Sequence, residues 1–339
     1  MKALVLTAHG APDVLKVREQ PEPIARRGQI RIAVRAAGVN FADIMARQGL
    51  YPDAPKPPAI LGYEVAGTVE SVGDGVTRWS VGDRVIAATR FGGFAELVAV
   101  SEHDALALPD ALGFDEGAAI PVVYGTAYAA VVRLGNVQRG DWILIHAVAG
   151  GVGIAATQLA HRLGARIFGT ASTSKHAAVH AQGVEHVIDY HTESVPRAIR
   201  KLTGGRGLDV ILDARGGRDF KESYDLLRAG GRLILYGASS IITDERRNLV
   251  SALKLVIGMP RFGAMNLMDQ NKSVLGLNLL RLWDDRGSFE EIARPLAQLL
   301  ADGNIKPVVG RVFPLEQAPD AHRFLQARQN IGKVVLRVS

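Results

Sequence analysis

A glycine-rich turn between an apolar run and a helical pattern is the feature that most constrains the fold of this chain. The apolar run Trp142–His146 leads directly into Ala-Val-Ala-Gly-Gly-Val-Gly at 147–153, and the pattern GIAATQLAHRLG follows. This order predicts a strand, a tight turn and a helix, whose N-terminal N–H groups are suited to bind a pyrophosphate. The match to G-x-G-x-x-G is imperfect, because Val148 occupies the first glycine position and only Gly150 and Gly153 fill the others. The alternative is a tight turn that binds no ligand.

Strand and helix patterns alternate from about residue 122 onward, which predicts a parallel, doubly wound sheet of the α/β class. The helix after the glycine turn is expected to end at Gly164, and His146 is expected to be a packed histidine at a strand end. The run SVLGLNLLRL at 273–282 is interpreted as the last strand of this sheet. An apolar strand at a sheet edge is prone to pair with another chain, so a homodimer is expected.

The first 120 residues have a different rhythm, in which short apolar runs alternate with glycine and proline. Period-two patterns such as QIRIAVRAAGV and EVAGTVESVGDGV predict a β-rich, barrel-like domain. The segment after the last expected strand returns to strand, helix and strand.

Composition excludes several classes of function. The chain has no cysteine, so disulfides, thiol nucleophiles and cysteine-ligated zinc are excluded. The net charge of +6 over 339 residues suits a phosphorylated ligand and is too diffuse to indicate nucleic acid. The most apolar segment, 118–132, is judged too short to span a membrane, and MKALVLTAHG does not resemble a signal peptide. A cytoplasmic protein is therefore expected.

The end of the second predicted strand indicates which dinucleotide would bind. An NAD site usually carries Asp or Glu about 20 residues after the glycines, where it bonds to the ribose 2′-hydroxyl. Here the stretch TASTSKH contains no acid but has Ser172, Thr173 and Lys175. Hydroxyls and a cation suit a 2′-phosphate, and a lysine at a helix start is unfavourable unless an anion is near. The stretch predicts NADPH as cofactor, with an exposed lysine as the alternative.

Motifs along the whole chain resemble the medium-chain dehydrogenase/reductase superfamily: GDRV, GGFAELVAV, AGGVG and NIGKVVL. The segments VNFADIMARQGLYP, YGTAYAA, GTASTSKH and VIDYH are similar to its zinc-free quinone oxidoreductase branch, and most similar to the vesicle-membrane-protein subgroup. The resemblance implies a GroES-like β-barrel catalytic domain, 1–121 and 283–339, and a Rossmann NADP-binding domain, 122–282. It also implies that the cofactor domain is inserted into the catalytic domain, and that the protein is a symmetric dimer.

The chain departs from the zinc-dependent members of that superfamily at the metal ligands. Asn40 stands where those relatives have a zinc-binding cysteine, and Tyr63 replaces the histidine of their Gly-His-Glu motif. Glu64 is the one ligand type that remains, and a single carboxylate cannot hold zinc. We therefore expect no metal and no oxidation of a zinc-bound alkoxide.

The resemblance also implies the roles of individual residues. Tyr51 is expected to donate a proton or bind the substrate carbonyl, with packing under Pro52 as the alternative, and Asn40 is expected near the nicotinamide. Asn40 with Asp43 also fits a helix N-cap, and both roles can hold. The further residues expected to contact the cofactor are Thr126, Ala149, Gly150, Gly151, Val152, Gly153, Ser172, Thr173, Lys175, Tyr190, Gly237, Ala238, Leu277, Leu279, Arg328 and Asn330.

Without a metal, hydride transfer requires an acceptor that is already electrophilic. A C=C bond conjugated to a carbonyl qualifies, so the expected substrate is an enone, a quinone or an enoyl thioester such as an acyl-CoA. The alternative function is a membrane- or lipid-associated binding protein that keeps the reductase fold. It rests on the connection 240–272, where three methionines lie near four basic residues: Met259, Met265, Met268, Arg246, Arg247, Lys254 and Arg261.

Overall fold

The computed structural model describes residues 1–242, 245, 253 and 257–338, and it divides into two compact units. One unit contains Met1–Gly125 and the chain from Leu280 onward, and the other extends from Thr126 to Leu279 with residue 245 excepted. Both units are α/β, one mainly antiparallel and one wholly parallel in its sheet, as the sequence patterns predict. Arg246, Arg247 and Lys254, on which part of the membrane alternative rests, lie outside the described residues.

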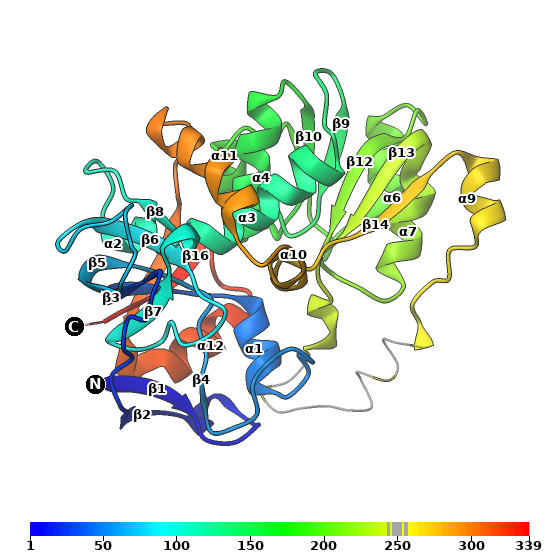
Figure 1. Ribbon diagram of the computed structural model, residues 1–339. Coiled ribbons are helices and arrows are strands. Elements are labelled where there is room, and N and C mark those ends of the chain that lie inside the picture. Colours follow the sequence, from blue (N-terminus) through cyan, green and yellow to red (C-terminus); the bar gives the residue numbers. More distant parts are fainter. Residues whose placement is uncertain (243–244, 246–252, 254–256, 339) are drawn as a thin grey trace. The chain divides into compact units, whose positions relative to one another are not determined.

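The first unit is built on a seven-stranded sheet in the order β15-β16-β3-β5-β6-β8, with β7 also paired to β3 (Figure 1). A smaller sheet has the order β2-β1-β4. Alternate residues are buried in the first part of the long strand β3, as the period-two pattern predicts, and its last four residues are all buried. The elements are β1 (Lys2–Leu6), β2 (Leu15–Glu19), β3 (Gln29–Val39), α1 (Phe41–Arg47), β4 (Ala59–Ile60), β5 (Glu64–Val72), β6 (Arg84–Ala88), β7 (Leu97–Ser101), β8 (Ala105–Ala107), α2 (Phe114–Gly117), α11 (Glu290–Ala301), β15 (Val309–Pro314), α12 (Ala318–Gln326) and β16 (Lys333–Arg337).

The second unit contains a parallel sheet in the order β11-β10-β9-β12-β13-β14. Counted along the chain this is 3-2-1-4-5-6, the order of dinucleotide-binding sheets. Figure 1 shows α4 on one face of the sheet, and α6 and α7 on the other. The elements are β9 (Trp142–Ile145), α4 (Gly151–Arg162), β10 (Arg166–Thr170), α5 (His176–His180), β11 (His186–Ile188), α6 (Val195–Leu202), β12 (Leu208–Asp213), α7 (Asp219–Leu226), β13 (Leu227–Leu235), α9 (Ala264–Gln270) and β14 (Ser273–Gly276).

One apolar core of this unit lies between the sheet and the helices α6 and α7. Ile199 of α6 and Tyr224 of α7 pack with Phe168 and Leu233 of the strands. These side chains are almost wholly buried. Their packing fixes the strands whose carboxyl ends form the candidate site.

One expectation about secondary structure is wrong. The strand expected at 273–282 ends at Gly276, and Leu279–Arg286 forms the helix α10. β14 does lie at the sheet edge, but a short apolar run such as LLRLW fits a helix as well as a strand. The apolar segment 118–132 belongs to the helical stretch Phe114–Leu134, which includes α3 (Pro121–Tyr128). This stretch is long and apolar enough to cross a membrane, but 72% of its most apolar window is buried in the fold, which indicates a core helix.

Candidate functional site

The glycine turn connects β9 to α4, as predicted, and its backbone is closely packed. Ala147 has a positive φ of 52°, and Gly150 caps α4 without any side chain that could occupy its N-terminal N–H groups. A Cβ on Gly153 would lie 2.6 Å from the carbonyl oxygens of Ala147 and Val148. The turn therefore requires glycine at 153 for close packing, and its helix N-terminus can receive an anion. The expected cofactor residues 149–153 all lie in this turn and the first turn of α4.

The missing first glycine of the motif has a structural explanation. Val148 is fully buried and lies against Gly169 of the neighbouring strand β10. A Cβ on Gly169 would lie 2.6 Å from the Val148 Cγ1 atom. The motif usually has a glycine at the position of Val148. Here the space for the larger valine side chain comes from Gly169 on the neighbouring strand.

A chain of buried hydrogen bonds supports the base of the turn. The His146 Nε2 atom lies 3.1 Å from the Ser223 hydroxyl, and this hydroxyl donates to the Asp213 carboxylate at 2.7 Å. On its other side, His146 Nδ1 lies 3.3 Å from the Thr170 hydroxyl oxygen, which also accepts the Ala147 N–H at 3.1 Å. Burial lowers the pKa of His146, so the ring is neutral and donates from one nitrogen. His146 is thus the packed strand-end histidine that the sequence predicts.

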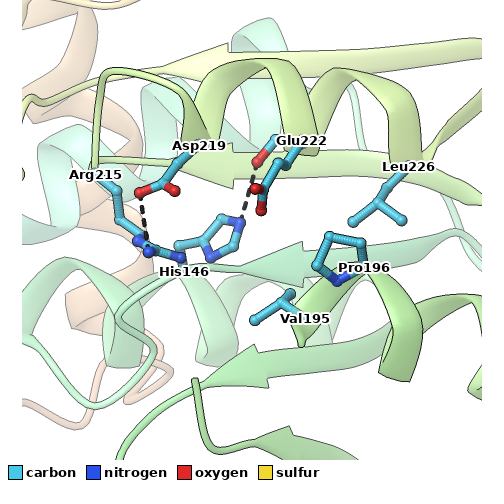
Figure 2. Close-up of a pocket in the computed structure, with 8 residues that line it drawn as sticks. His146, Val195, Pro196, Arg215, Asp219, Glu222 and Leu226 are labelled. Carbon is cyan, nitrogen blue, oxygen red and sulfur yellow. Dashed lines mark hydrogen bonds and ion pairs between the residues drawn. The ribbon is translucent and has the colours of Figure 1, made fainter. Parts of the chain in front are cut away.

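A small cavity beside His146 is shown in Figure 2, with Val195 and Pro196 on one side and the ion pair of Arg215 and Asp219 on the other. Its volume is about 10 Å³, which is room for about one water molecule. A nicotinamide or a substrate cannot enter this space. The cavity belongs to the support of the turn.

The predicted 2′-phosphate residues lie at the carboxyl ends of the adjacent strands β10 and β11. Ser172, Thr173 and Lys175 form a short turn after β10, and Tyr190 follows β11. The Thr173 N–H and hydroxyl both donate to the Asp189 carboxylate, at 2.8 and 2.5 Å. These bonds, with the His191 N–H, lower the pKa of Asp189 to about 2. The Thr173 hydroxyl therefore holds the turn in place.

An arginine that the sequence analysis did not select lies beside this region. The Arg215 guanidinium is 5.7 Å from the centre of the Tyr190 ring, which is also packed on the His191 ring at 4.2 Å. Arg215 forms an ion pair with Asp219 at 2.9 Å. A second cation thus accompanies Lys175 at this edge of the sheet.

The remaining expected cofactor residues of this unit follow the next strands. Gly237 and Ala238 follow β13 after one intervening residue, Tyr236. The Leu277 N–H, just after β14, donates to the Leu235 carbonyl at 2.8 Å. Leu279 begins the helix α10. Because carboxyl ends of parallel strands share one sheet edge, these segments lie on the same side as the glycine turn.

For three of the expected cofactor residues, the contacts described below neither support nor exclude a contact with the cofactor. Thr126 is buried within α3, with 8% of its surface exposed. Arg328 and Asn330 belong to the other unit, in the segment between α12 and β16. Arg328 has a positive φ of 55°, and the Asn330 side chain donates to the Gly332 carbonyl at 2.7 Å. Their cofactor roles stay predictions.

A buried polar cluster organises the catalytic unit around Asn40. The Asn40 side chain donates to Glu64 Oε1 at 2.9 Å and accepts from the Lys333 ammonium at 2.5 Å. Lys333 also pairs with Glu64 at 2.5 Å, and the Val122 N–H donates to the second Glu64 oxygen at 2.8 Å. Gly38 makes room for the cluster, since a Cβ there would lie 2.6 Å from Glu64 Oε1. Both polar ends of the Asn40 amide are therefore occupied within the protein.

The N-cap role predicted for Asn40 is fulfilled by its backbone. Asn40 precedes α1, and its N–H donates to the Asp43 carboxylate at 2.8 Å. The Gly62 N–H donates to the other Asp43 oxygen at 3.1 Å. Burial nevertheless raises the pKa of Asp43 to about 7.

Tyr51 follows α1 in a loop and packs against the apolar core of the catalytic unit. Its ring meets the Tyr63 ring edge to face, with centres 6.3 Å apart, and Tyr63 also contacts Phe91 at 5.2 Å. Near Tyr51, Asp53 forms a two-point ion pair with Arg281, both contacts at 3.1 Å. Tyr51 thus lies in a cluster of aromatic rings, near the ion pair of Asp53 and Arg281.

Comparison with known proteins identifies the family. The alcohol dehydrogenase GroES-like domain model matches residues 26–110, and the zinc-binding dehydrogenase model matches residues 182–336. The human synaptic vesicle membrane protein VAT-1 homolog is 39% identical over 99% of this chain and 86% of its own length. Human quinone oxidoreductase is 32% identical over 99% of this chain and 97% of its own length. The chain belongs to the medium-chain dehydrogenase/reductase superfamily. Within it, the chain falls in the zinc-free branch of quinone oxidoreductases and VAT-1-like proteins.

Solved structures of this superfamily agree with the fold. A CurK enoyl reductase superposes with a TM-score of 0.87 at 28% identity, covering 100% of this chain and 99% of its own. A mycobacterial protein described as complexed with NADPH superposes with a TM-score of 0.86 at 33% identity, covering 99% of this chain and 100% of its own. The protein is therefore an oxidoreductase of the medium-chain type, with a GroES-like unit and a Rossmann unit. The predicted family and fold class are confirmed.

The zinc after which one matching model is named does not fit the residues of this chain. Neither Asn40 nor Tyr63 supplies a thiolate or imidazole, and Glu64 already binds a lysine, an amide and a backbone N–H. In the part of the chain that the structure describes, no group of three or more His, Asp or Glu residues could hold a metal ion. The Lys333 ammonium already neutralises the Glu64 carboxylate.

The glycine turn, in contrast, fits a nicotinamide dinucleotide. It combines a side-chain-free N-cap, close backbone packing and a position at the carboxyl edge of a 3-2-1-4-5-6 sheet. Sequence analysis missed Lys333, Asp189 and Arg215 as parts of the site. Lys333 belongs to the motif NIGKVVL, but nothing in the sequence indicates that it lies beside Glu64.

Proposed function

We propose that the protein is an NADPH-dependent, metal-free reductase of activated C=C bonds. The observation that carries the proposal is the buried Asn40–Glu64–Lys333 cluster, which replaces a metal site by a saturated hydrogen-bond network. A site without a Lewis acid favours acceptors that are electrophilic by themselves, such as enones, quinones and enoyl thioesters. Relatives described as quinone oxidoreductase and enoyl reductase support both substrate types.

Residues of one unit would bind the cofactor, and residues of the other would bind the acceptor. The N-terminal turn of α4 would bind the pyrophosphate, while Ser172, Lys175 and Arg215 would surround the 2′-phosphate. The bound nicotinamide supplies the hydride. Tyr51 would donate a hydrogen bond to the acceptor oxygen, on which negative charge develops during reduction. Asn40 would stabilise the catalytic unit, because its side-chain amide binds Glu64 and Lys333 and its backbone N–H binds Asp43.

The preference for NADPH is tested by two dissociation constants. We expect NADPH to bind at least tenfold more tightly than NADH, because a charge-assisted bond to the 2′-phosphate contributes about 1.5–3 kcal/mol. Lys175→Ala should remove most of this preference. Lys201→Ala, an exposed lysine in the last turn of α6, is the matched control and should retain it. Equal affinities in the wild-type protein contradict the NADPH assignment.

The acceptor class is tested by NADPH oxidation with 2-cyclohexenone, crotonyl-CoA and 1,4-benzoquinone. Turnover of at least one of these is expected, and turnover should survive exhaustive chelation. If none is reduced while NADPH binds, the reductase proposal is wrong.

One observation favours the second candidate function, a surface that contacts lipid. Met265 and Met268 of α9 are 77% and 73% exposed, which is unusual for large apolar side chains. Sedimentation with anionic liposomes tests this candidate. Binding that is lost in Met265→Ser/Met268→Ser, in a protein that turns over no acceptor, would favour it over the reductase.

A further inference from the structure

The position of Tyr63 is fixed by its own backbone. Tyr63 lies just before β5, and its carbonyl accepts the Thr89 N–H at 2.7 Å. The preceding Gly62 donates its N–H to Asp43 at 3.1 Å, and its carbonyl accepts the Thr89 hydroxyl at 2.8 Å. These three bonds, with a φ of 99° at Gly62, hold the backbone at Tyr63 in place.

The Tyr63 hydroxyl is an unsatisfied group in an otherwise well-paired site. The side chain is 5% exposed, and its hydroxyl has no hydrogen-bond partner among the described residues. Its neighbours Tyr51 and Phe91 make ring contacts, which phenylalanine would make equally well. A buried hydroxyl without a partner costs about 1–3 kcal/mol, so a purely structural residue at this position would lack it.

The surroundings of the hydroxyl define what it can bind. Burial, with the nearby carboxyl of Asp43, raises the pKa of Tyr63 well above its ordinary value. The phenol therefore stays protonated and can donate its O–H to an acceptor atom of a ligand. The Tyr51 ring beside it is apolar and aromatic, a kind of side chain that stacks with planar conjugated molecules.

We propose, on the basis of the reductase function above, that the Tyr63 hydroxyl donates a hydrogen bond to the acceptor's carbonyl oxygen next to Tyr51. Tyr63 is then a specificity-determining residue that selects carbonyl compounds among activated alkenes. A site with a buried donor discriminates strongly against ligands that lack the matching acceptor, because the donor is left unpaired.

Tyr63→Phe tests this role because stability and activity should move in opposite directions. The variant should melt at the same or a higher temperature, since a cost is removed. Its kcat/KM for 2-cyclohexenone should fall about tenfold or more, while the KM for NADPH stays within twofold. Tyr224→Phe is the matched control, because the Tyr224 hydroxyl bonds to Asn266 at 3.3 Å in the cofactor unit. This control should keep its kcat/KM.

Each outcome decides between the possibilities. Unchanged kcat/KM in Tyr63→Phe overturns the inference and leaves the reductase function standing. Lower activity together with a lower melting temperature also overturns it, because the hydroxyl would then serve the fold. If the wild-type protein reduces no acceptor, the reductase function fails, and cyclohexenone binding by saturation-transfer NMR decides the role of Tyr63. Weaker binding by the variant then supports the hydrogen bond, and equal or absent binding overturns it.

Discussion

Replacing Lys333 by methionine should destabilise the catalytic unit strongly. The ammonium is 4% exposed and lies 2.5 Å from both Glu64 and Asn40, while Glu64 is fully buried. Methionine fills a similar volume but leaves the Glu64 carboxylate without its counter-charge. Removing one partner of a buried ion pair costs about 3–5 kcal/mol. For a unit of this size about 2–4 °C is lost per kcal/mol, so the melting temperature should fall by roughly 6–20 °C.

A second substitution at Glu64 distinguishes loss of charge pairing from loss of packing. Glu64→Gln/Lys333→Met has no buried charge in the pair, and its glutamine can still accept the Val122 N–H. The double variant should regain more than half of the stability lost in Lys333→Met. Lys16→Met, an exposed lysine on β2, is the control and should change the melting temperature by less than about 2 °C. Differential scanning calorimetry of the four proteins checks the prediction. A single variant as stable as the wild type, or a double variant no better than the single one, would refute the reasoning.

Three further predictions concern pH, the glycine turn and assembly. Because burial raises the pKa of Asp43 to about 7 from 3.8, the folded state holds a proton that the unfolded chain releases between these values. The contribution of Asp43 to stability is therefore greatest at the acid end of this range and falls as pH rises towards 7, by up to about 4 kcal/mol. Thermal melts of the wild type and of Asp43→Asn should differ by this pH-dependent contribution. Gly153→Ala places a Cβ 2.6 Å from two carbonyl oxygens, so NADPH affinity by fluorescence titration should fall about tenfold or more, and unchanged affinity would contradict the assigned turn. The exposed edge of β14 predicts a homodimer in light scattering at micromolar concentration, and a monomer would contradict it.

Local patterns in the sequence predict much of the cofactor unit. The turn at 147–153 and the helix end at Gly164, with its φ of 79°, follow from residue types a few positions apart. The sequence does not predict the structure of the apolar run after Gly276. The spacing of its apolar residues fits a strand and a helix equally well.

Contacts between distant parts of the chain were beyond sequence reasoning. Thr173 is predicted to contact a phosphate, and the sequence gives no sign that its hydroxyl donates to Asp189, which follows another strand. Asn40 is predicted near the nicotinamide, and the sequence gives no sign that its amide is held by Glu64 and Lys333. Such pairings depend on which strands become neighbours, and no spacing within one segment encodes that order.

The distance along the chain between Glu64 and Lys333 has a consequence for biosynthesis. When the segment with β5 leaves the ribosome, Glu64 has no cation to pair with, because β16 is translated more than 250 residues later. The parallel-sheet unit is complete by then and can fold during translation as an independent body. The first 125 residues cannot complete their core until β16 is translated, because burying the Glu64 carboxylate without Lys333 is costly. Nascent chains stalled before residue 333 should therefore carry a folded cofactor unit beside a protease-sensitive N-terminal segment.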